Sequence, residues 1–316
     1  MMDSQSLKHQ WESFNAKESF KQLSVIGTTK WFYGYQNTGN KTLLIISNIP
    51  IKTLKSSDEI LIVTRYRGLD NKYTLTLELQ DIKYEDVFYS LCSDLYNYSQ
   101  QFNSKSEKII IAQLSKRYSE WNRLFKGKKS DLLDASRIKG LIGELLFLEL
   151  LLNTNKDHLS IIQGWTGPDR KDQDFIFADN WYEVKAVKLD ADSVKISSLE
   201  QLLPESDGFL IVQKIEECNP NKTEGFSLND LVYRIKDLLV NEEEALLLFE
   251  AKLLQAGYVN LSDYSLLKYS LEGSDHYCIN DSFPRLTNQV VPSQVIRCMY
   301  ELSLSAIAPW KTENLK

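Results

Sequence analysis

The segment from about residue 132 to residue 216 constrains the fold most, because a strongly apolar helix pattern stands directly before a run of short strands. The helix pattern is SRIKGLIGELLFLELLLN, with apolar residues at the three- and four-residue spacing of a helix face. Two short strands around the turn ADN follow, then a predicted short helix and a further strand, GFLIVQKI. This order predicts an α/β core in which helices flank a mixed central sheet.

The patterns on either side of this core differ from it, and a chain of 316 residues has room for more than one domain. Residues 1–130 predict an N-terminal α+β region, with a helical start, a small antiparallel sheet from about residue 25 to residue 82, and two helical stretches after it. Residues 131–216 form the predicted core. Residues 217–316 resume a helical pattern, end in strand-like stretches, and are expected to pack on the core as a C-terminal region. The class of the whole chain is therefore α+β around an α/β core.

The stretch DQDFIFADNWYEVKA, residues 172–186, reads as a β-hairpin that carries charges where a purely structural hairpin needs none. Side chains alternate faces along a strand, so Glu183 and Lys185 share one face. If Asp174 pairs with either of them, all three charges lie on the same side of the sheet. The two carboxylates are then about 5 to 8 Å apart at their Cβ atoms. Taken alone, the pattern also fits a hairpin with a solvated charged face.

Two carboxylates at that spacing repel each other unless something neutralises them, and a divalent cation does so well. Mg²⁺ prefers oxygen ligands and is often held by one or two carboxylates with waters and substrate phosphates. Asp174 and Glu183 are the predicted ligands, and the carbonyl of Val184 can add a third. Asp172 remains an alternative to Asp174, because it has the same strand parity. Lys185 is expected to orient the attacking water or to stabilise charge on the scissile phosphate, which indicates metal-assisted phosphodiester hydrolysis.

Two flanking segments add candidates at the same metal site: Glu144 as a further metal ligand and catalytic residue, and Gln201 as a catalytic residue. Glu144 directly follows the two glycines of GLIGELLFLEL, and glycine at such positions often lets a helix pack closely on a sheet. In KISSLEQL, Ser197 or Ser198 is a suitable N-cap for a helix that carries Gln201 over the site. Each segment also has a structural alternative. Glu144 fits the surface of an amphipathic helix, and the serines fit a simple capping box.

Seven short motifs follow one another from about residue 119 to the C-terminus: EWNRLF, GLIGELLFLE, GWTGPDRKDQDF, WYEVKA, KISSLEQL, LLQAGY and DSFPRLT. This ordered series resembles the PD-(D/E)XK nuclease superfamily, and within it the PD-(D/E)XK motif proteins of bacterial restriction-like and phage-defence gene clusters. The resemblance implies a restriction-endonuclease-like core. It makes Glu144 the helix glutamate, Asp174 the metal aspartate, and Glu183 with Lys185 the E-x-K pair. The Pro-Asp dipeptide at 168–169 departs from the family pattern, because it precedes Asp174 by five residues.

Members of this superfamily are mostly Mg²⁺-dependent DNA nucleases, although some have lost activity, and here every matched catalytic position is occupied. The resemblance therefore implies a DNA endonuclease of a restriction-modification or anti-phage defence system that uses Mg²⁺, with Mn²⁺ able to replace it. Cutting both strands requires two sites, which predicts a homodimer or partner subunits such as an ATPase or a methyltransferase. The alternative is a catalytically silent nuclease-fold subunit that serves as the DNA-binding or scaffold component of a defence complex.

The net charge of −6 argues against a protein that holds nucleic acid mainly by bulk positive charge, so contact with DNA requires a local patch. The best candidate is SKRYSEWNRLFKGKKSD, in which aromatic residues interleave basic ones. Its six predicted phosphate contacts are Lys116, Arg117, Arg123, Lys126, Lys128 and Lys129. The same segment fits a solvated helix face equally well.

Several other classes of protein lack their motifs here. The four cysteines and three histidines show no metal-binding or disulfide-framework spacing, so buried free thiols are expected. The sequence contains neither a P-loop for nucleoside triphosphates nor the G-x-S-x-G elbow of esterases. The polar N-terminus predicts no signal peptide, and no apolar stretch is long enough to span a bilayer. We therefore expect a cytoplasmic protein with no membrane contact.

Overall fold

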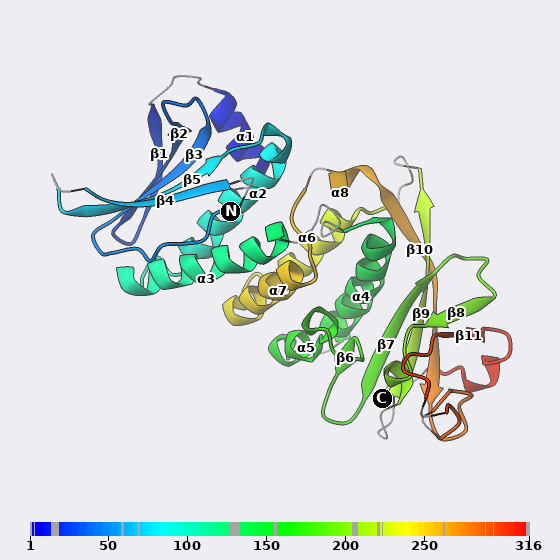
Figure 1. Ribbon diagram of the computed structural model, residues 1–316. Coiled ribbons are helices and arrows are strands. Elements are labelled where there is room, and N and C mark those ends of the chain that lie inside the picture. The colour runs from blue at the N-terminus through cyan, green and yellow to red at the C-terminus, as the bar shows by residue number, and fades with distance from the viewer. Residues whose placement is uncertain are drawn as a thin grey trace. The chain divides into compact units, whose positions relative to one another are not determined.

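The computed structural model describes two compact units, whose elements are drawn in Figure 1. Unit 1 comprises Met1–Leu132 and Val259–Ser262, and unit 2 comprises Leu133–Tyr258 and Asp263–Lys316. The described residues are all except 1, 3, 14–18, 58–59, 68–69, 127–132, 155–156, 204–207, 220–221, 223, 262, 288, 293 and 314–316, with the backbone alone described at 61 and 123–126. Compactness does not show which segments fold independently, so the division into regions 1–130, 131–216 and 217–316 stays a prediction.

Unit 1 is built on a five-stranded antiparallel sheet with the strand order β1-β2-β3-β5-β4. Its strands are β1 (Phe20–Ile26), β2 (Thr29–Tyr35), β3 (Lys41–Ser47), β4 (Ile60–Arg67) and β5 (Lys72–Leu79). Leu75, Leu77 and Leu79 alternate along β5 and are all buried, as expected for a strand with one face on the core. The small antiparallel sheet predicted for this part of the chain is therefore present.

Helices and an aromatic cluster close one face of this sheet. In the described residues of unit 1 the helical elements are α1 (Ser4–Glu12), η1 (Ile82–Tyr84), α2 (Glu85–Gln100) and α3 (Glu107–Lys126). Trp11 of α1 is fully buried, with its ring centroid 5.4 Å from that of Tyr33 on β2 and 5.7 Å from that of Phe88 on α2. Its indole Nε1 donates to the carbonyl of Gly34 at 3.0 Å. The buried indole thus has the hydrogen-bond partner that its polar edge requires.

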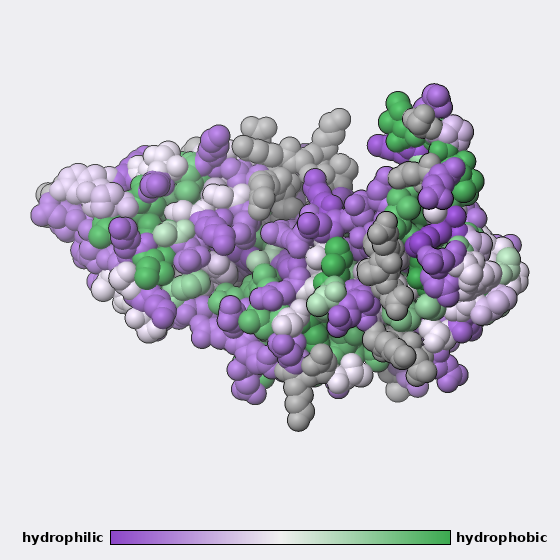
Figure 2. All heavy atoms as spheres, turned by 90° about the horizontal axis from the view of Figure 1, so that it is seen from below, coloured by the Kyte–Doolittle hydropathy of each residue, from purple (hydrophilic) through white to green (hydrophobic). Residues whose placement is uncertain are grey.

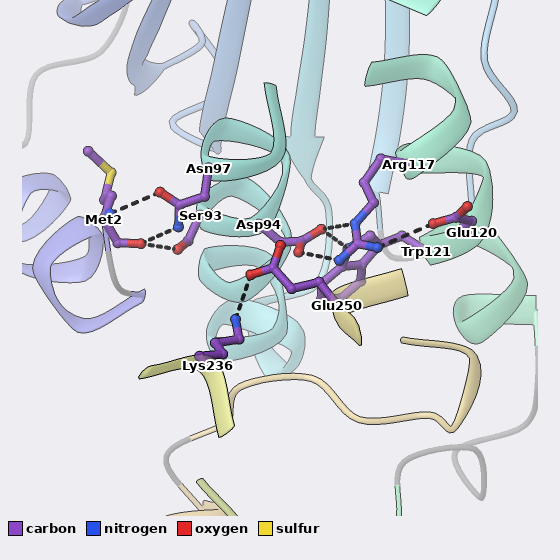
Figure 3. Close-up of polar contacts among 9 residues, drawn as sticks. All are labelled: Met2, Ser93, Asp94, Asn97, Arg117, Glu120, Trp121, Lys236 and Glu250. Carbon is purple, nitrogen blue, oxygen red and sulfur yellow. Dashed lines mark hydrogen bonds and ion pairs between the residues drawn. The ribbon is translucent and has the colours of Figure 1, made fainter. Parts of the chain in front are cut away.

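Arg117 of α3 is buried in a cluster of charged and aromatic groups that joins α3 to α2 (Figure 3). Its Nε and Nη2 donate to the two oxygens of Asp94 at 2.8 and 2.7 Å, and its Nη1 lies 3.3 Å from Glu120 Oε2. Trp121 Nε1 donates to Asp94 Oδ2 at 2.7 Å. Only 3% of the Arg117 side chain is exposed, so this two-point ion pair is shielded from water.

Unit 2 contains a mixed four-stranded sheet with the order β10-β9-β7-β6. Strand β7 (Trp181–Val187) runs parallel to β9 (Gly208–Cys218). The outer strands β6 (Phe175–Ile176) and β10 (Lys268–Ile279) are antiparallel to their neighbours. The C-terminal region therefore supplies one strand of the core sheet, and the predicted strand signals around residues 268–279 form a single long strand.

Helix α4 (Ala135–Thr154) covers one face of this sheet, and Figure 1 shows it alongside β7. Its Phe147 ring lies 5.2 Å from that of Phe175 on β6. A Cβ on Gly143 would lie only 3.3 Å from Ala186 Cβ on β7, so glycine permits this close approach of helix and strand. The other helices in the part of unit 2 that the structure describes are α5 (His158–Gly164), α6 (Leu228–Leu238), α7 (Glu243–Gln255) and α8 (Asp263–Leu266).

A second, smaller sheet covers the opposite face. It pairs β8 (Ser193–Ile196) with β11 (Tyr300–Ser303) in antiparallel fashion. Val194 and Leu302 of this sheet share a buried cluster with Trp181 and Leu210 of the main sheet. The sequence predicted helices on the flanks of the central sheet. The structure has helix α4 on one face and a two-stranded sheet on the other.

Two finer expectations are wrong. Residues 200–202 form a single 3₁₀ turn, η4 (Glu200–Leu202), with Leu199 at the N-cap position and no side-chain cap, so neither predicted serine caps a helix here. The N–H of Ser197 instead donates to Gln201 Oε1 at 2.7 Å. All four cysteines are free, but only Cys92 is buried, and the other three are partly exposed. Unit 2 also contains the 3₁₀ turns η3 (Gly167–Asp169) and η5 (Ala308–Trp310).

The surface is mixed in character. On the face drawn in Figure 2, hydrophilic residues alternate with small apolar patches. Within the described part of the chain, no helix combines the length and apolarity needed to cross a bilayer.

From the Asp94–Arg117 ion pair we expect the loss of Asp94 to destabilise the fold much more than the loss of Glu120. Asp94→Ala removes the two oxygens that accept from the Nε and Nη2 of a buried guanidinium, one of which also accepts from Trp121, and this should lower the free energy of unfolding by about 3 kcal/mol. Glu120→Ala removes one 3.3 Å contact and leaves the main pair intact, so its cost should stay below about 1 kcal/mol. Urea unfolding followed by tryptophan fluorescence measures both, and equal losses would contradict this account of the pair.

Candidate active site

Asp174 is fixed by its backbone and its side chain at the entrance to β6. Its carbonyl accepts hydrogen bonds from the N–H groups of Thr166 and Gly167, at 2.7 and 2.9 Å. Its Oδ2 accepts from the N–H of Val184 at 2.8 Å. The β6–β7 register pairs Phe175 with Tyr182, and one further step along it places Asp174 opposite Glu183. This is one of the two registers that the alternation of charges predicted.

Glu144 reaches Asp174 from α4, around Gly167. Trp165 Nε1 donates to Glu144 Oε2 at 2.8 Å. A Cβ on Gly167 would lie 2.6 Å from Glu144 Oε2 and 3.2 Å from Asp174 Oδ1, so both carboxylates converge on this glycine. Any side chain at residue 167 would collide with one of them, which explains the need for glycine at this point of close approach.

Glu183 and Lys185 form the second half of the cluster, on β7. Glu183 is 1% exposed, and Lys185 Nζ lies 2.7 Å from its Oε1. In the described residues neither Glu183 oxygen accepts a well-directed hydrogen bond. The ion pair with Lys185 is therefore the main interaction that offsets the burial of the Glu183 carboxylate. Lys185 Nζ also donates to Gln201 Oε1 at 3.1 Å, and the N–H of Ser197 donates to the same oxygen at 2.7 Å. Gln201 therefore does reach Lys185, from the turn η4 and not from a helix.

The three carboxylates all hold protons more tightly than usual. Burial, and then the charge of Asp174, raise the pKa of Glu144 to about 8, although Trp165 and Lys185 act the other way. Burial raises the pKa of Asp174, against the opposing effects of Lys185 and the Val184 N–H. Burial and the charge of Asp174 raise the pKa of Glu183 well above its ordinary value. The single positive charge of Lys185 does not balance the negative charges of three ionised carboxylates. The cluster therefore favours the uptake of protons or of another cation.

The donor set fits a hard divalent cation. No three His, Cys, Asp or Glu side chains of the described residues already stand at the spacing of a complete metal site. Mg²⁺ needs fewer protein ligands, because waters and substrate phosphates fill much of its octahedron. Asp174 Oδ1, which faces Gly167, and the Glu183 oxygens, whose neighbouring donor is the Lys185 ammonium, are suitable ligands. The Val184 carbonyl as a further ligand stays a prediction.

The other aspartates of the loop lie apart from this cluster. Asp172 is exposed, whereas Asp174 lies among the other two carboxylates, so geometry favours Asp174 as the ligand. Asp169 of the Pro-Asp dipeptide pairs instead with Lys252 Nζ on α7, at 2.9 Å. The dipeptide therefore serves to hold the loop, which explains why its spacing departs from the family pattern.

Three positions that support the site escaped the sequence reasoning: Trp165, Gly167 and Lys252. Lys252 is buried, and its Nζ donates to the carbonyl of Trp165 as well as to Asp169. It thereby fixes the residue whose indole holds Glu144. A lysine in the apolar helix pattern EEALLLFEAKLLQ was a visible signal for a buried cation, but its partner 83 residues away was not.

The predicted basic patch is only partly described. Lys116 is exposed and lines a pocket of about 590 Å³ in unit 1 together with Lys55. Arg117 is buried in its pair with Asp94, so the prediction that it contacts DNA is wrong. Arg123 and Lys126 belong to α3 by their backbone, but their side chains lie outside the described residues, as do Lys128 and Lys129 entirely.

A mixed sheet that carries an aspartate, an E-x-K pair and a helix glutamate defines the PD-(D/E)XK nuclease class of fold. A family model agrees: the family described as "Putative PD-(D/E)XK family member, (DUF4420)" matches residues 7–305. The chain belongs to this family, and the family match confirms the resemblance found in the sequence. No curated protein and no solved structure matches the chain.

The raised pKa of Glu144 predicts a pH-dependent stability. An acid whose pKa is higher in the folded than in the unfolded state stabilises the fold fully below its unfolded value, near 4.5 for glutamate. That contribution is lost as pH rises through the folded value of about 8. In metal-free buffer the thermal midpoint should therefore fall between pH 5 and pH 9, and it should fall less in Glu144→Gln, which cannot ionise.

Glu149→Gln is the matched control, because Glu149 lies on the same helix but pairs with Arg234 at 2.7 Å. The thermal midpoint of Glu149→Gln should fall between pH 5 and pH 9 by as much as that of the wild type. A Glu144→Gln curve parallel to that of the wild type would show that Glu144 ionises as freely in the folded as in the unfolded chain.

Proposed function

We propose that this protein is a metal-dependent endonuclease that hydrolyses phosphodiester bonds of DNA. The observation that carries the proposal is the cluster of Asp174, Glu183 and Lys185 with Glu144 beside it, in which Glu183 is buried and the other side chains are partly buried. A fold gains no stability from three neighbouring carboxylates with one lysine, because burial penalises their charged forms. Groups with strongly perturbed pKa values at one place are characteristic of a chemical site.

The side chains divide the work as follows. Asp174 and Glu183 would hold a divalent ion, with Mg²⁺ the expected species and Mn²⁺ able to replace it. When bound, the ion polarises the phosphodiester and lowers the pKa of a bound water. Lys185, anchored between Glu183 and Gln201, places its ammonium where negative charge develops on the phosphate. Glu144, with a pKa of about 8, can hold or release a proton near neutral pH.

The setting is proposed from the family and the order of the motifs. The ordered motif series favours a role in a restriction-modification or anti-phage defence system, in the cytoplasm, where free thiols persist. Cleavage of both strands would require a homodimer or partner subunits such as an ATPase or a methyltransferase.

A second candidate is a nuclease-fold subunit that binds DNA or acts as a scaffold without cutting. The net charge of −6 and the burial of Arg117 favour it, because both reduce the positive surface available to DNA. The complete set of acidic and basic groups at the site disfavours it. The two candidates differ in whether purified protein cleaves DNA when a divalent cation is added.

Cleavage should depend on one aspartate of the loop and not on its neighbour. With Mg²⁺ or Mn²⁺, Asp174→Asn should cut plasmid DNA at least about 100-fold more slowly, because the neutral amide keeps its size but loses the ligand charge. Glu183→Ala and Lys185→Ala should lose activity likewise. Asp172→Asn changes an exposed carboxylate two residues away and should cut within about threefold of the wild-type rate.

Circular dichroism spectra establish that each variant folds. Folded Asp174→Asn and Glu183→Ala proteins that cut at the wild-type rate would rule out the assignment. No cleavage by the wild type alone or with added cation would favour the non-catalytic subunit.

Binding of the cation should be measurable without any substrate. A ligand present at about 100 times its dissociation constant stabilises a fold by about 2.7 kcal/mol. Saturating Mn²⁺ should therefore raise the thermal midpoint of the wild type and of Asp172→Asn. Asp174→Asn and Glu183→Gln should show little or no rise, and a full rise in both would place the cation elsewhere.

A further inference from the structure

A pocket of about 280 Å³ opens beside Glu144, on the side of α4 that leads to its N-terminus. Its walls come from the start of α4, from η3 and from the last turn of α7, all within unit 2. The apolar lining is provided by Leu133, Leu141, Pro168 and Ala256. Since Glu144 belongs both to this lining and to the carboxylate cluster, whatever fills the pocket lies next to the proposed active site.

Gly140 keeps this pocket open. A Cβ added at Gly140 would meet no atom within 4 Å, unlike one at Gly143, which would press on β7. Packing therefore explains Gly143 but not Gly140, and a glycine inside a helix costs about 1 kcal/mol relative to alanine. The missing side chain leaves space in the lining of the pocket, which a methyl group would leave largely open and a side chain as large as leucine would fill.

Two arginines give the pocket its polar character. Arg137 lies in the first turn of α4, and Arg170 follows η3 with a left-handed backbone at φ 59°, its N–H bonded to the carbonyl of Gly167 at 3.0 Å. Both side chains are exposed and line the pocket, and Gln255 adds an amide. Guanidinium groups bind phosphate oxygens in a two-point geometry, and amides can bond to the edges of bases.

We propose that this pocket binds one nucleotide of the substrate strand, next to the phosphodiester that is cut. The phosphate of that nucleotide lies against Arg137 and Arg170, and its base lies against the apolar walls. This pocket combines apolar walls with converging polar groups, and sites for small organic units use both kinds of lining. That the nucleotide belongs to a DNA strand rests on the proposed function. Binding of a nucleotide to the pocket can be measured without any cleavage.

The test uses the full-length chain and deoxynucleoside 5′-monophosphates as probes, with inorganic phosphate and a deoxynucleoside alone as the two partial probes. Isothermal titration calorimetry gives each dissociation constant. Gly140→Leu fills the pocket, leaves the carboxylates and the lysine unchanged, and replaces glycine with a better helix former. It should weaken monophosphate binding at least about tenfold.

Gly140→Ala is the matched control, because a methyl group fits the open space, and it should bind within about threefold of the wild type. Arg170→Gln removes one guanidinium and should weaken the monophosphate and phosphate alone, but not the deoxynucleoside. In the wild type the monophosphate should bind more tightly than either partial probe.

The outcomes separate this inference from the proposed function. If the monophosphate binds no more tightly than the partial probes, or if Gly140→Leu binds it as well as the wild type, the nucleotide pocket is refuted even in a protein that cuts DNA. If Gly140→Leu loses monophosphate binding and the wild type cuts no DNA, the pocket is supported and only the nuclease assignment fails.

Discussion

Three carboxylates gathered around one lysine constrain unit 2 more than any other interaction. Glu144, Asp174 and Glu183 come from a helix, a loop and a strand, and each has a pKa raised by burial. Keeping such groups together opposes folding, so the surrounding structure must hold them in place. Lys185 supplies the one cation of the group, and Gln201 fixes its direction. Holding the carboxylates close together raises the free energy of the fold, and binding of a divalent cation between them would offset this cost.

The loop between α5 and β6 shows how the chain meets that cost. The N–H groups of Thr166 and Gly167 hold the backbone of Asp174, and Trp165 holds Glu144. Lys252 in turn binds the carbonyl of Trp165 from α7. Supporting groups of this kind orient the carboxylates of the cluster, as outer hydrogen bonds orient the ligands in known metal sites. The same loop and helix also line the pocket beside Glu144, so catalysis and nucleotide recognition would share one rigid frame.

Much of this architecture was readable from the sequence, and the reasons are physical. Strand alternation placed Asp174, Glu183 and Lys185 on one face, and the apolar pattern of α4 marked the helix that carries Glu144. What failed depends on contacts distant in sequence. Helical periodicity marks a basic stretch of α3 but does not show that Arg117 turns inward, because its partner Asp94 lies on another helix. The small sheet that covers one face of the core pairs β8 with β11, which lie more than 100 residues apart in the sequence. Local sequence patterns do not reveal a pairing over that distance.

The central claim is that Asp174 and Glu183 share one divalent cation. Anomalous diffraction from a crystal soaked in Mn²⁺ tests it most directly, because the ion itself is located independently of any activity. The account predicts a single strong anomalous peak within about 2 to 2.5 Å of an oxygen of Asp174 and an oxygen of Glu183. A crystal without a peak at these two carboxylates, or with its peak at other residues, would contradict it.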